Sequence, residues 1–64
     1  MSNKRETQQA AQDMVARYGE NARREVELRI AELREHGEEE ALTLWIEIRK
    51  AVIALLVKGS RTLN

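Results

Sequence analysis

The chain contains no cysteine and no proline, and among its 64 residues there are only three glycines, one tryptophan and one tyrosine. Disulfides are therefore excluded, and one histidine offers no recognisable set of metal ligands. A domain of this size buries only about 60% of the surface of its unfolded chain, so it is marginally stable. Oligomerisation is the remaining way to stabilise it.

An excess of charge of one sign is also missing, because eleven basic and eleven acidic residues balance to zero. Interspersed charges of this kind produce no long-range field that would attract nucleic acid or anionic lipid. The longest apolar run, Ala51 to Val57, is far shorter than the roughly 20 residues that span a bilayer. The polar segment Met1 to Gln12 lacks the apolar core of a secretory signal. We therefore expect a soluble, cytoplasmic protein.

Helix-forming residues dominate what is present, and without proline they predict an all-α fold. Asn3 and Glu6 have the spacing of a capping box, which places the start of a first helix near Lys4. In a continuous helix its main apolar positions lie within roughly 120° of one another. These positions are Ala11, Val15, Tyr18, Ala22, Val26, Ile30 and Leu33, with Ala10 and Met14 alongside.

Gly19 leaves this periodicity in phase, and a glycine inside a helix costs only about 1 kcal/mol. We therefore predict that the first helix is continuous, or merely kinked at Gly19, as far as His36. The alternative is that Gly19 caps a short first helix and Asn21 starts the next one.

The second boundary has stronger signals. His36 and Gly37 are typical of a helix C-terminus, and Glu38, Glu39 and Glu40 favour a helix N-terminus. An αα-hairpin turn is predicted here. Lys58 and Gly59 repeat the stop signal, so we predict one domain over residues 1–64, with frayed termini at 1–3 and 59–64.

The second predicted helix, Glu38 to Lys58, is apolar over roughly 240° of its circumference. A surface helix needs an apolar stripe only a little wider than about 100°, so this helix should contact at least two neighbours. Its polar strip consists of Thr43, Glu47, Lys50, Ala54 and Lys58.

A continuous first helix of roughly 50 Å would extend beyond a second helix of roughly 30 Å. Apolar residues of both helices would then remain uncovered, and an antiparallel homodimer forming a four-helix bundle could cover them. The predicted interface consists of Leu42, Trp45, Ile46, Ile53, Val57, Val15 and Tyr18, whereas Ile48, Val52 and Leu55 should meet the chain's own first helix. A monomeric three-helix bundle that folds back at Gly19 is the competing arrangement.

Residues suited to catalysis are scarce. His36 lies near Glu32, Glu39 and Glu40, but a metal site would need more convergent ligands, so we interpret it as a helix-capping histidine beside solvated acids. No catalytic triad and no glycine-rich phosphate loop is present. The arginines alternate with glutamates and form no basic cluster for nucleic acid. We expect no enzymatic activity, no cofactor and no metal.

Several residues resemble a pattern in short, uncharacterised α-helical proteins that are common in alphaproteobacteria. They are the run Ala16-Arg-Tyr-Gly-Glu-Asn-Ala22, residues 29–33, His36-Gly37, Ala41, Trp45, Ile48 and Leu55-Leu56. The resemblance spans roughly Val15 to Leu56 and implies a bacterial cytosolic αα-hairpin protein. It implies no activity.

These observations favour a non-enzymatic module for self-association or protein–protein interaction that forms a homodimer. The first alternative is a small regulator or adaptor that binds a larger protein through its second, amphipathic helix. A membrane-surface helix is less well supported, because Lys50 and Lys58 are the only lysines beside the apolar face. A nucleic-acid binder is disfavoured by the balanced charge.

Overall fold

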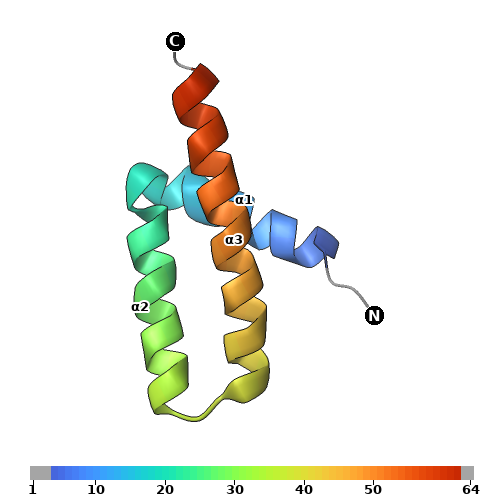
Figure 1. Cartoon of the computed structure of the whole chain (residues 1–64), viewed down its shortest axis with the longest axis vertical. Coiled ribbons are helices and arrows are strands. Elements are labelled where there is room, and N and C mark those ends of the chain that lie inside the picture. Colours follow the sequence, from blue (N-terminus) through green and yellow to red (C-terminus); the bar gives the residue numbers. More distant parts are fainter. Residues whose placement is uncertain (1–3, 63–64) are drawn as a thin grey trace.

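Three α-helices and one short 3₁₀ turn make up the fold. The computed structural model describes residues 4–62, with α1 at Lys4–Tyr18, η1 at Gly19–Asn21, α2 at Ala22–Glu35 and α3 at Glu39–Thr62. Helices α2 and α3 lie side by side and antiparallel, whereas α1 crosses behind α3 at a steep angle (Figure 1). The predicted all-α fold and the helical hairpin of α2 and α3 are confirmed.

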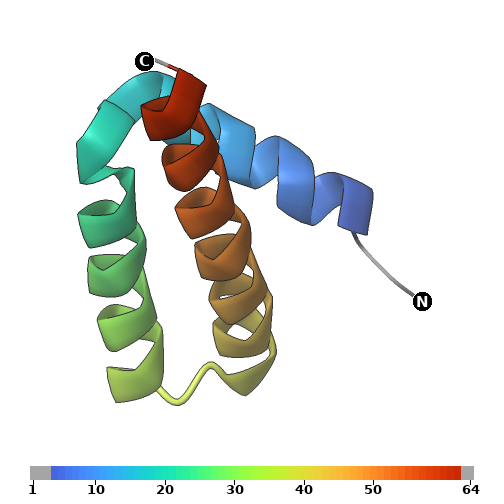
Figure 2. The same ribbon diagram turned by 45° about the horizontal axis from the view of Figure 1, so that its top comes forward.

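The chain breaks at Gly19, so the prediction of one continuous or merely kinked first helix is wrong for this structure. Gly19 has φ +58°, a left-handed conformation, and the 3₁₀ turn that it begins redirects the chain by a large angle (Figure 2). The alternative, in which the chain folds back at Gly19, is what the structure shows. A straight helix in a single chain would leave α1 without a neighbour, whereas the break lets α1 pack against α3.

The helix C-terminus predicted at His36-Gly37 is present, and in the structure it is a Schellman motif. Gly37 has φ +70°, its N–H donates to the carbonyl of Arg34 at 3.2 Å, and the N–H of Glu38 donates to the carbonyl of Leu33 at 3.0 Å. His36 occupies the C-cap position of α2. Because the motif is built from neighbouring backbone groups, its sequence signal was sufficient.

Helix α3 continues beyond its predicted end. Its backbone remains helical through Gly59 to Thr62, so the stop predicted at Lys58-Gly59 does not end the helix. One glycine inside a helix costs only about 1 kcal/mol, too little to terminate it without a competing turn. Residues 1–3, with the predicted Asn3 cap, and residues 63–64 lie outside the described part of the chain.

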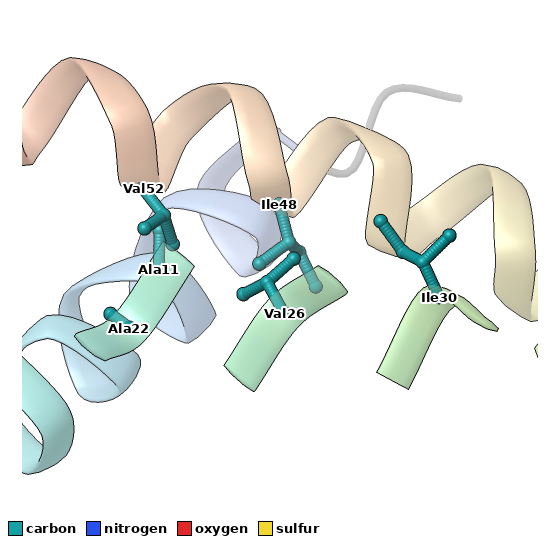
Figure 3. Packing of buried hydrophobic residues seen from close by; sticks show 6 residues of the cluster. All are labelled: Ala11, Ala22, Val26, Ile30, Ile48 and Val52. Carbon is teal, nitrogen blue, oxygen red and sulfur yellow. The ribbon is translucent and has the colours of Figure 1, made fainter. Parts of the chain in front are cut away.

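The core is small. Among the side chains of residues 4–58, the buried ones are Ala11, Ala22, Val26, Ile30, Ile48 and Val52. Figure 3 shows them converging from all three helices, with Ala11 drawn next to Val52. Valines are the largest side chains in this part of the chain with less than 2% exposure. Alanines at the crossing let the helix backbones approach closely, but they add little apolar area.

Two isoleucines of α3 test how far the core extends. Ile48 is 2% exposed, whereas Ile53 is half-buried and is not among the residues packed against the buried cluster. We expect Ile48→Ala to lower the free energy of unfolding by about 2–5 kcal/mol, and Ile53→Ala to lower it by about 1 kcal/mol or less at high dilution. Urea unfolding followed by circular dichroism measures both values, and equal losses would contradict this description of the core.

Candidate interaction surface

Contacts between charged and aromatic side chains set how α2 and α3 align. Arg49 Nη1 of α3 lies 3.2 Å from Glu27 Oε1 of α2. The guanidinium carbon of Arg29 lies 5.6 Å from the centre of the Trp45 ring, in a cation–π arrangement. The Arg49–Glu27 pair remains partly exposed and adds at most about 1 kcal/mol, so its main effect is to define the alignment.

This alignment leaves the C-terminal part of α3 without α2 beside it. In an antiparallel pair, the two contacts place Ala22, the first residue of α2, level with residues 52–54 of α3, about Ile53. Beyond that level α3 continues to Thr62, and the neighbouring helix there is α1, which crosses it instead of running along it (Figure 1). A crossing helix covers only a short length of its partner.

The predicted interface residues fall into two groups. Four of them are half-buried and pack against the chain's own core, namely Val15, Leu42, Trp45 and Ile46. The other three are more open: Val57 is 54% exposed, Tyr18 is 40% exposed, and half-buried Ile53 is not among the partly buried residues packed against the core. The first group therefore has intramolecular partners, and contact of either group with a second chain stays a prediction.

Helix α3 does contact its own chain through the residues expected to do so. Ile48 and Val52 are buried between the helices, and half-buried Leu55 packs against them. Trp45 packs against the same cluster while Arg29 lies over its ring. Trp45 is thus part of the monomer core and partly accessible, so its indole could also meet a partner.

Two exposed leucines were absent from the predicted interface. Leu28 of α2 is 54% exposed and Leu44 of α3 is 37% exposed. The exposure of Leu28 could have been predicted from the sequence, because Leu28 lies roughly opposite the core residue Val26 on the helical wheel. The helical wheel gave no sign that Leu44 is exposed, because it places Leu44 on the same side of α3 as the buried residues Ile48 and Val52. Its exposure could be seen only in the tertiary structure.

Several other polar side chains form pairs within one helix. Lys50 Nζ lies 3.5 Å from Glu47 Oε2, Arg29 Nη1 lies 3.9 Å from Glu32 Oε1, and Thr43 Oγ1 donates to the carbonyl of Glu39 at 3.1 Å. Within residues 4–62, no three histidine, cysteine or acidic side chains are grouped in a way that could hold a metal ion. No helix in the described range is long and apolar enough to cross a membrane.

No family model, curated protein or solved structure matches this chain. The resemblance to alphaproteobacterial helical proteins therefore remains an expectation, and function has to be argued from the surface itself.

The Arg29–Trp45 contact can be tested by a double-mutant cycle. We expect Trp45→Ala alone to cost about 3 kcal/mol of unfolding free energy, and the cycle with Arg29→Ala to show a coupling of about 0.5–1 kcal/mol. Arg23→Ala is the control. Arg23 lies on α2 nearly two helical turns before Arg29, the residue that faces Trp45, so its effect should be additive with that of Trp45→Ala. A coupling for Arg23 as large as that for Arg29 would show that the ring stacking is not the cause.

Proposed function

We propose that this protein is a non-enzymatic self-association module that forms a homodimer through the apolar surface of α3. The observation that supports this is the poor burial of the most apolar helix. Between residues 39 and 58, only Ile48 and Val52 are buried among its large apolar side chains. Those left partly or largely exposed are Leu42, Leu44, Trp45, Ile46, Ile53, Leu55, Leu56 and Val57.

Energetics favour covering this surface. Burial of apolar area contributes roughly 25 cal/mol per Å², and a core whose largest fully buried side chains are two valines leaves a 64-residue chain with little stability. A stable protein–protein interface takes about 800 Å² from each partner. The whole chain exposes 5288 Å², so one face of the 24-residue α3 is a suitable source of that area.

Geometry favours the part of α3 that runs past α2. Ile53 lies about level with the start of α2, and Val57 lies one helical turn beyond it. Ile53 is not among the partly buried residues packed against the core, and Val57 is 54% exposed. A two-fold axis beside them would place the same residues of a second copy opposite, which gives a closed, self-complementary interface. A larger partner protein that presents an apolar groove would use the same residues, so the adaptor function is the alternative outcome of the test.

Matched charge substitutions test this proposal. Ile53→Glu would bury an unpaired carboxylate in the dimer, a cost of several kcal/mol, whereas Ala54→Glu adds the same charge at the neighbouring exposed position in the polar strip. We expect wild type and Ala54→Glu to sediment at micromolar concentration with twice the 7.4 kDa mass of one chain. Ile53→Glu should sediment as a folded monomer, with its helix content checked by circular dichroism.

A wild-type protein that remains monomeric at millimolar concentration would contradict self-association and leave the adaptor function as the better proposal. A dimeric Ile53→Glu variant of unchanged stability would instead show that the interface lies elsewhere on the molecule.

A further inference from the structure

The largest backbone departure at the break between α1 and α2 is the positive φ of Gly19. Tyr18, Asn21 and Ala22 all have right-handed helical conformations, and no non-glycine residue in the described chain has positive φ. Gly19, with φ +58°, is the only residue of this turn outside the right-handed side of the Ramachandran plot. A straight helix would need a large change of φ at Gly19, whereas Tyr18 and Asn21 would need only smaller adjustments within the right-handed region.

Side-chain capping does not hold this turn in place. Neither Tyr18, before η1, nor Asn21, before α2, makes a side-chain cap hydrogen bond. The Gly37 turn has a complete Schellman motif, whereas the Gly19 turn has a 3₁₀ bond from the Ala22 N–H to the Gly19 carbonyl. The packing of α1 against α3 is thus what favours the bent form.

A straight helix would keep its apolar face. The buried residues Ala11, Ala22, Val26 and Ile30 would lie within roughly 100° of one another on a continuous helix, because Gly19 does not shift the periodicity. Residues 4–35 would then span about 48 Å, and α1 would extend beyond its own α3. Its apolar side would need another α3 to pack against.

We propose that Gly19 is the hinge of a helix exchange, in which α1 leaves the α3 of its own chain and packs against the α3 of a second copy. This inference rests on the proposed self-association and specifies its form. The contacts of α1 with α3, Ala11 beside Val52 among them, are available in both forms. The equilibrium between the bent monomer and the exchanged dimer therefore depends on the backbone conformation preferred at Gly19 and on the protein concentration.

Gly19→Ala tests the hinge without changing packing, because a Cβ at this position would have no neighbour within 4 Å. Alanine is strained in the left-handed conformation and is favoured over glycine inside a helix. Both effects act at two hinges per dimer, so the dissociation constant of the dimer should fall by roughly a thousandfold.

Gly37→Ala is the matched control. Gly37 has a similar φ of +70° and equally open surroundings, but its turn is present in both the closed and the exchanged form. We expect it to lower the stability of the fold while leaving the dissociation constant within about tenfold of wild type, because the strain cancels between the two forms.

The exchange is measured as a distance within one chain. Spin labels on Gln8→Cys and Glu32→Cys, both exposed positions of a cysteine-free chain, report it by pulsed electron resonance. Dilution with excess unlabelled protein removes distances between chains. The straight helix gives a backbone separation of about 36 Å, and the bent form gives a clearly shorter one because α1 turns away from the axis of α2 (Figure 2).

We expect the long distance in the wild-type dimer and in Gly19→Ala, and the short distance in the wild-type monomer at high dilution. A dimer by sedimentation that keeps the short distance would overturn the exchange but leave self-association intact. A monomer at all concentrations would overturn both. Should Gly19→Ala fail to fold, the wild-type dilution series alone decides between these outcomes.

Discussion

The packing of α1 across α3 is the contact on which the rest of this structure depends. Without it the chain would be a two-helix hairpin, and Ile48 and Val52 would lose the cover that α1 and its buried Ala11 provide. The small side chain of Ala11 allows the backbones of α1 and α3 to approach closely where they cross. It also limits the apolar area that the crossing buries. The break at Gly19 and the exposure of α3 beyond Val52 both follow from where α1 crosses.

A small core of alanines, valines and isoleucines gives the chain a low free energy of unfolding. Domains of this length are marginally stable even with well-filled cores, and Trp45, the largest side chain of this chain, is only half-buried. The apolar side chains that α3 leaves uncovered would be a liability in an isolated molecule. The proposed self-association would cover them.

The hairpin could be predicted because its signals are local. His36 and Gly37 end α2 through hydrogen bonds among residues 32–38, so this short stretch of chain contains the necessary information. Gly19 shows the opposite case, because a glycine in phase with an apolar stripe is compatible with a straight helix and with a break. Gly59 was misjudged for the same reason, since α3 continues through it. For the candidate surface, the apolar width of α3 was predictable, but which of its residues pack inside the chain was not, and Leu28 and Leu44 were missed.

Taken alone, the sequence determined the helices, the hairpin turn at His36-Gly37 and the apolar width of the last helix, because these follow from periodicity and from neighbouring residues. Tertiary structure decided the bend at Gly19, the path of α1 and hence which side chains of α3 remain exposed. Those features depend on contacts between residues far apart in the chain, such as Ala11 with Val52, whose free energy exceeds the small local preference of one glycine.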